Sequence, residues 1–137
     1  MSLEAALYDI LSTAAGVTVL VGGAHSPRIY PLGIPAGKNV PAVVYQHVSS
    51  DVPLSCEGDG DLRSDHIQIV CWDDDPDGAR VLAEAVRAAL QAASGSHGSV
   101  TVMYCSILDE GDLYEHNEQN ENLSRYGKRQ DWEIAYQ

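Results

Sequence analysis

Polar and apolar residues alternate in the C-terminal segment Arg129-Gln130-Asp131-Trp132-Glu133-Ile134-Ala135-Tyr136-Gln137. Side chains alternate across a pleated backbone, so this spacing predicts a β-strand with Trp132, Ile134 and Tyr136 on one face. The charged residues, which are Arg129, Asp131 and Glu133, fall on the other face. An apolar face of this kind has to pack against a core, so the strand is expected to close a half-covered sheet.

Three further segments have the composition of strands. Residues 42–49 and 65–72 are β-rich runs, and Ser50 to Ser64 joins them as an acidic, glycine-containing connection. This order predicts a hairpin with a long arm. Residues 100–108 are expected to form a third strand, which makes 129–136 the fourth.

The first helix is predicted at the N-terminus. Ser2 is placed to cap it, apolar residues follow at helical spacing to Ala14, and Gly16 is placed to end it. The short apolar run at residues 17–21 fits either a last helical turn or a short strand. Residues 24–41 contain four prolines, so an irregular path over the surface is expected.

The second helix is predicted to begin after Asp75, which can act as N-cap with Pro76 at the first helical position. Residues 94–98, rich in glycine and serine, are expected to end it. Its apolar stripe consists of Ala79, Leu82, Ala83, Val86, Ala89, Leu90 and Ala93. Together the elements predict one α+β domain over residues 1–137, with a mainly antiparallel sheet of about four strands and two helices packed on one face.

The charge of the chain excludes one class of function. Acidic side chains number 20 and basic ones 8, which gives a formal net charge of -12. Nucleic-acid affinity depends on lysine and arginine displacing counterions, so specific nucleic-acid binding is not expected. An acidic wall instead suits a channel through which DNA passes without sticking, because like charge suppresses adsorption.

The three cysteines, Cys56, Cys71 and Cys105, cannot form a complete disulfide set and lack the spacing of a zinc or redox motif. A reducing, cytoplasmic setting fits this pattern. The sequence shows no signal-peptide pattern and no run of about 20 apolar residues, so a soluble protein without a membrane span is expected.

One metal motif is matched by spacing. Asp73, Asp75 and Asp77, followed by Gly78 and Glu84, fit the pattern of a calcium loop. A strand-like segment precedes the loop where a helix is required, so we favour an acidic turn that complements the helix N-terminus. A calcium-dependent or metal-assisted binding module remains the alternative function.

No other catalytic or cofactor site is predicted. The histidines are scattered, although His47 and His66 would be cross-strand neighbours if the first two strands pair, and could then hold a metal. Ser96-His97 lacks the turn of a hydrolase nucleophile, and Gly58-Asp59-Gly60-Asp61 places acids where a phosphate needs donors. We therefore expect no enzyme activity, no cofactor and no resident metal.

The order of several short motifs resembles the tail-completion, or head-to-tail joining, proteins of long-tailed bacteriophages and prophages. The motifs, which span essentially the whole chain, are Ser2-Leu3-Glu4-Ala5-Ala6-Leu7-Tyr8, Arg28-Ile29-Tyr30-Pro31, Pro41-Ala42-Val43-Val44-Tyr45-Gln46, Ile67-Gln68-Ile69-Val70-Cys71-Trp72, Ala83-Glu84-Ala85-Val86-Arg87-Ala88-Ala89-Leu90, Asp112-Leu113-Tyr114-Glu115 and the closing aromatic strand. The resemblance implies a structural subunit of a hexameric ring that caps the tail tube and docks it to the head connector or stopper. It also implies location in the virion, after assembly in the host cytoplasm.

A ring requires one patch of a subunit to meet a different patch on the next copy. The predicted interface lies in the arm from Ser50 to Ser64 and in the segment from Leu113 to Tyr126, because apolar residues there interrupt otherwise polar stretches. Local packing against the sheet edge is the alternative role for each of them. The predicted interface residues are Val52, Pro53, Leu54, Leu113, Tyr114, Arg125 and Tyr126.

Overall fold

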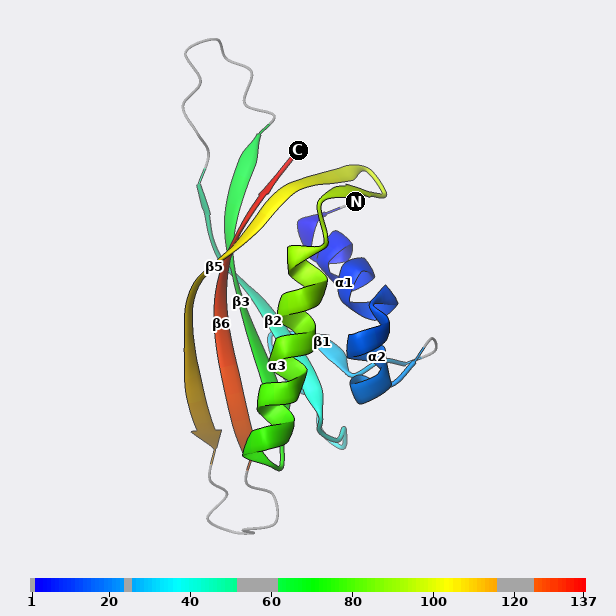
Figure 1. Ribbon diagram of the computed structural model, residues 1–137, viewed down its shortest axis with the longest axis vertical. Coiled ribbons are helices and arrows are strands. Elements are labelled where there is room, and N and C mark those ends of the chain that lie inside the picture. Colours follow the sequence, from blue (N-terminus) through cyan, green and yellow to red (C-terminus); the bar gives the residue numbers. More distant parts are fainter. Residues whose placement is uncertain (1, 24–25, 52–61, 116–124) are drawn as a thin grey trace.

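The structure is a computed structural model, and it describes residues 2–23, 26–51, 62–115 and 125–137. In chain order the elements are α1 (Leu3–Thr13), α2 (Ala15–Val21), β1 (Ile29–Pro31), β2 (Ala42–Asp51), β3 (Arg63–Asp73), α3 (Pro76–Gln91), β4 (Gly95–His97), β5 (Val100–Glu115) and β6 (Arg125–Tyr136). The helices cover one face of a strongly twisted sheet (Figure 1). The α+β class with helices on one face is therefore confirmed.

The sheet has the strand order β1-β2-β3-β6-β5-β4. The pair β1–β2 is parallel, and the other neighbouring strands are antiparallel. The C-terminal strand β6 lies between β3 and β5, with Trp132 opposite Ile67 on one side and Ile107 on the other. The strand predicted from the alternating sequence is thus a central strand.

The prediction of about four strands was wrong, because the described part of the chain forms six. The two additional strands, β1 and β4, contain three residues each. Three residues are too few to show the alternation that identifies a strand. β1 lies in the proline-rich segment 24–41, where we expected an irregular path, and pairs with β2 through Ile29 and Val43.

The prediction of two helices was also wrong, since residues 15–21 form a third. The chain leaves α1 at Ala14, which is extended, and re-enters a helix at Ala15 with a bend of 82°. Gly16, which we expected to end the first helix, lies instead in the first turn of α2. Thr13 donates a hydrogen bond of 2.7 Å from Oγ1 to the Asp9 carbonyl, a bond that competes with the helical backbone and accompanies the break.

Both predicted N-caps are confirmed. The Ser2 hydroxyl accepts a hydrogen bond from the Ala5 amide at 3.2 Å, and the Asp75 carboxylate accepts one from the Asp77 amide at 3.3 Å. Pro76 occupies the start of α3, as expected. No single helix in the described ranges has the length and apolar composition needed to cross a membrane; α1 and α2 reach that length only as a bent pair.

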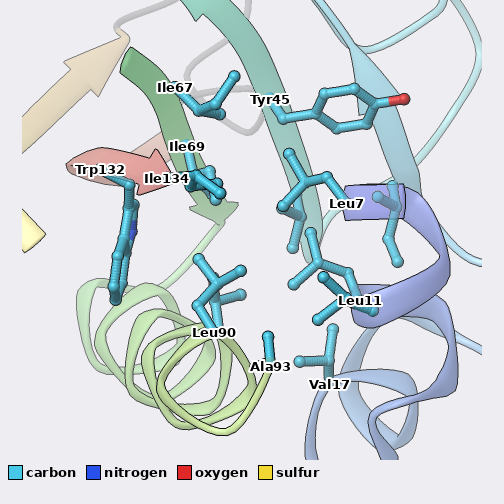
Figure 2. Packing of buried hydrophobic residues seen from close by; sticks show 14 of the residues in the cluster. Leu7, Leu11, Val17, Tyr45, Ile67, Ile69, Leu90, Ala93, Trp132 and Ile134 are labelled. Atoms are coloured by element: carbon cyan, nitrogen blue, oxygen red, sulfur yellow. The ribbon is translucent and has the colours of Figure 1, made fainter. Parts of the chain in front are cut away.

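The apolar face of β6 is confirmed, because Trp132 and Ile134 point toward the helices and are buried. The other face is less exposed than its charged residues predicted: Arg129 and Glu133 are half-buried, and Asp131 is buried beneath the partners described below. Figure 2 shows Trp132 and Ile134 beside Leu90 of α3, and Leu7 and Leu11 of α1 closing the same core. Burial of these side chains is the main contribution to the stability of the fold.

A chain of hydrogen bonds crosses this core. Trp132 donates from Nε1 to the Gln130 side-chain oxygen at 3.1 Å, and Gln130 donates from Nε2 to the Ala83 carbonyl of α3 at 3.0 Å. Trp132 and Gln130 are both completely buried. The indole N–H of Trp132 and the side-chain amide of Gln130 therefore both have hydrogen-bond partners. These bonds offset the free-energy cost of taking the two polar groups out of water.

On the opposite face, the Trp72 ring of β3 lies against Gly127 of β6, its partner in the strand register. A Cβ atom at Gly127 would come within 2.9 Å of Trp72 Cζ3. The close approach of the ring therefore requires glycine at this position.

We predict that Trp132→Ala lowers the free energy of unfolding by about 3 to 5 kcal/mol, the usual cost of removing a buried aromatic ring. Urea denaturation of the purified protein measures this change. Tyr104→Ala is the matched control, because Tyr104 is 48% exposed and should change stability by about 0.5 kcal/mol or less. Equal losses in the two variants would show that Trp132 does not anchor the core.

Candidate assembly surface

The structure brings four of the predicted interface residues together at the end of the β5–β6 hairpin. Tyr114 pairs with Tyr126 across the two strands, and Leu113 and Arg125 lie beside this pair in the register. The tyrosine rings are tilted at 37°, with centroids 5.0 Å apart. The other three predicted residues, Val52, Pro53 and Leu54, lie outside the described residues.

The hairpin is longer than the sequence pattern indicated. The predicted strand 100–108 extends to Glu115, and the predicted strand 129–136 begins at Arg125. The acidic run from Asp109 to Glu115, which lies beyond the predicted strand, is therefore part of β5. Acidic residues have low strand propensity, which explains why the predicted strand ended at residue 108.

Cations from neighbouring elements hold this acidic strand in place. Lys128 on β6 lies 3.0 Å from Asp112, and Arg129 lies 3.2 Å from Asp109. Glu110 faces the opposite way from Asp109 and meets Arg87 of α3 at 3.6 Å. Lys128 and Arg129 are adjacent in the sequence. Their pairing with Asp112 and Asp109 follows from the register between β5 and β6, which the sequence pattern does not give.

Arg129 links two carboxylates on the face away from the helices. It contacts both Asp109 and Asp131, and His66 adds a contact of 3.0 Å to Asp131. The hydrogen bond from Arg129 is the main reason why the pKa of Asp109 lies below its usual value. The ionised form of Asp109 is thereby favoured, and its pairing with Arg129 persists to lower pH than for an aspartate without such a partner.

A groove of about 440 Å³ lies between the first turns of α3 and the end of the β5–β6 hairpin. Its apolar walls come from Leu113, Tyr114 and Tyr126, and acids and bases alternate along its rim. The lining residues are Pro76, Asp77, Ala79 and Arg80 from α3, and Asp112, Leu113, Tyr114, Tyr126, Gly127 and Lys128 from the hairpin. Leu113 and Tyr114 remain 37% and 56% exposed, so apolar area is available to a partner.

β5 also forms an open edge of the sheet. β4 pairs with it only at residues 100–102, so within the described ranges no strand lies beside residues 103–115 on the side away from β6. The register with β6 shifts at Met103 and at Leu108 and is regular from Asp109 to Glu115. The regular part includes Leu113 and Tyr114, so exposed apolar side chains lie on this edge strand.

The acidic turn before α3 has the form that we favoured over a calcium loop. Asp75 caps the helix, and the Asp73 carboxylate accepts a hydrogen bond of 2.7 Å from the Asp74 amide and leaves no room for a side chain at Gly78. Burial raises the pKa of Asp73. Glu84, the last residue of the motif, bonds to Arg80 at 3.0 Å. Each of Asp73, Asp75 and Glu84 thus has its own partner within the chain.

His47 and His66 are not direct cross-strand partners. A register shift places His47 opposite Ile67 and His66 opposite Ser49. Each histidine meets a different carboxylate, Asp65 at 3.4 Å and Asp131 at 3.0 Å respectively. Over the described residues, no three His, Cys, Asp or Glu side chains converge as metal ligands would.

The two cysteines that the structure describes lie on strands and are protected. Cys71 is completely buried, and its burial raises the pKa of the thiol. Burial raises the pKa of the Cys105 thiol to about 11. Both thiols therefore remain protonated at neutral pH, when they are poor nucleophiles. Cys56 lies outside the described residues.

We predict that the acidic turn does not bind calcium with the affinity of a sensor site, because Asp75 and Glu84 are committed to bonds within α3. Isothermal titration of the protein with CaCl₂ measures this. A dissociation constant below about 10 µM, the weak limit of sensor sites, would contradict the prediction.

Comparisons with known proteins identify a family and a solved structure of similar fold. A family model described as tail completion protein gp17 matches residues 5–124. A solved structure titled "Virion of native gene transfer agent (GTA) particle" contains a chain with the same fold, at a TM-score of 0.67 and 20% sequence identity, covering 99% of this chain and 96% of that one. No protein with a curated description matches the sequence. The family match covers most of the chain, and the protein therefore belongs to the tail completion protein gp17 family of phage structural proteins.

Proposed function

We propose that the protein forms a ring at the head-proximal end of the phage tail and joins the tail to the head connector. Its partners in this role are further copies of itself, in a hexamer, together with the tail-tube protein and the connector or stopper proteins. Family membership supports a structural role in the tail. The subunit would assemble in the host cytoplasm and remain in the virion.

The open edge of β5 is the observation that carries the ring. A strand edge that no other strand covers is a template for another chain. The edge of β5 lies on one side of the sheet and β1 on the other. The same edge of a second copy could cover it only in a two-fold dimer, so in a larger ring the neighbour covers it with a different surface. Such a contact between unlike patches generates a closed ring when the rotation between copies closes.

The distribution of charge supports a passage for DNA through the ring. Arg80, Arg87, Lys128 and Arg129 all pair with carboxylates of the same chain. Arg28 donates to the carbonyls of Leu20 and Pro41. Few cations therefore remain to bind phosphates, and the net charge of -12 repels a passing duplex.

We predict that Leu113→Asp folds normally and fails to assemble onto tails. Leu113 is already partly exposed in the free subunit, so its replacement should change the free energy of unfolding by about 0.5 kcal/mol or less. An unpaired carboxylate buried in an interface costs several kcal/mol, on the order of 3 to 5. Thermal melts of the purified variant and electron microscopy of complemented phage measure the two effects.

Val19→Asp is the matched control for this substitution. Val19 is 79% exposed on α2, a helix that Figure 1 shows on the other side of α3 from β5 and β6. It should fold and assemble like the unchanged protein. If Leu113→Asp also assembles normally, the hairpin end is not part of the ring interface; if it melts early, Leu113 belongs to the core of the subunit.

We also predict that the purified protein does not bind free duplex DNA at moderate salt. Ordinary non-specific association has dissociation constants of roughly 1 to 100 µM and rests on cations that are free to contact phosphates. In this protein Arg80, Arg87, Lys128 and Arg129 pair with carboxylates instead. A mobility-shift assay over a salt series measures it. Salt-sensitive binding tighter than about 1 µM would contradict the proposed acidic passage.

A further inference from the structure

A loop on one side of the subunit complements the groove on the other side. The loop joins β1 to β2 and consists of residues 32–41. Leu32 is 76% exposed and has a φ of 67°, an unusual conformation for leucine. Lys38 is exposed and forms no ion pair with the described residues. The loop therefore displays an apolar side chain and a cation without a partner.

The backbone holds this loop in a fixed shape. Leu32 donates a hydrogen bond of 2.9 Å from its amide to the Tyr45 carbonyl of β2, and Gly33 donates one of 2.8 Å to the Pro31 carbonyl. The Lys38 amide donates to the Pro35 carbonyl at 3.2 Å. A loop ordered in this way loses little entropy when it binds.

The lining of the groove is complementary to the loop, because it contains apolar side chains and carboxylates. Leu113, Tyr114 and Tyr126 supply apolar surface to its lining, and Asp77 and Asp112 supply carboxylates. Asp77 is 87% exposed in its side chain and lies 4.0 Å from Arg80, so its carboxylate can accept a stronger bond. Tyrosine faces also attract a cation directly.

The positions of loop and groove suit a ring. In Figure 1 the end of the β5–β6 hairpin, which lines the groove, and the β1–β2 loop lie toward the end of the molecule where α3 begins, with the hairpin on the left of α3 and the loop on the right. Copies placed side by side therefore bring the loop of one subunit level with the groove of the next. The same side carries the open edge of β5, so the groove continues the interface proposed above.

We propose that the β1–β2 loop of one subunit docks in the groove of the next copy, with Leu32 against the tyrosine wall and Lys38 beside Asp77. This inference rests on the ring-forming function and names the surface that meets the hairpin. It assigns a partner to the exposed Leu32 and to Lys38. The contact is between unlike patches, as a ring requires.

Cysteine cross-linking tests the contact. Leu32→Cys and Leu113→Cys are combined in one chain in which Cys56 and Cys105 are replaced by serine, and a short bismaleimide is added to purified protein and to isolated tails. We expect a ladder of covalent oligomers. Each single-cysteine variant should remain monomeric, because neither patch meets itself, and so should the control pair of Leu32→Cys with Val19→Cys.

Charge variants test the role of Lys38 in the same assay. Lys38→Glu should lower the yield of the ladder about tenfold, as loss of about 1.4 kcal/mol of binding does. Lys38→Arg should retain the yield, and Lys38→Glu combined with Asp77→Lys should recover it. Asp9→Lys on α1, which is half-exposed in its side chain, makes the same change of charge as Asp77→Lys. Combined with Lys38→Glu it is the control for the recovery and should leave the yield low.

The outcomes separate the two proposals. Rings on tails without a ladder from the Leu32 and Leu113 pair would overturn the docking and leave the proposed function intact. A ladder that also forms from single-cysteine variants would overturn the contact between unlike patches. Absence of the protein from tails, together with no ladder in solution, would overturn both.

Discussion

The buried hydrogen bonds that join Trp132, Gln130 and the Ala83 carbonyl constrain how α3 sits on the sheet. An apolar helix face alone does not fix the position of a helix along a sheet, because the hydrophobic effect is non-directional. The bond from Gln130 to a main-chain oxygen of α3 is directional and fully buried, so sliding would leave polar groups unsatisfied. The position of α3 in turn fixes the groove, since one of its walls is the first turn of that helix.

The end of the hairpin illustrates how a strand with unfavourable composition is kept in the sheet. Asp109, Glu110 and Asp112 would repel one another and favour a loop. Lys128 and Arg129 on β6 and Arg87 on α3 supply one cation for each of them, on the face where each carboxylate points. Individually such partly exposed pairs contribute little, about 0 to 1 kcal/mol. Their common effect is to extend the ladder as far as Tyr114 and Tyr126.

Much of the central framework could be predicted from the sequence, because β6, the core of β3 and the stripe of α3 have clear periodicity and caps. The strands β1 and β4 could not, since three residues carry no period and their pairing depends on distant partners. Leu113 and Tyr114 were predicted as interface residues because they are apolar residues in a polar stretch, with Arg125 and Tyr126 from the same segment, and the four lie together at the end of the hairpin. The groove was not predicted, because it depends on how α3 is placed beside the hairpin, which no local pattern encodes.

The contact between Trp72 and Gly127 fixes the alignment of β6, which carries part of the candidate surface, with β3. If β6 slipped by one residue relative to β3, Tyr126 or Lys128 would stand opposite Trp72, and a side chain would collide with the ring. Such a slip would also turn Trp132 away from the core. The space above Gly127 is therefore occupied by the indole of Trp72. One residue without a side chain thus fixes the register of β6, and with it the position of the β5–β6 hairpin, relative to β3.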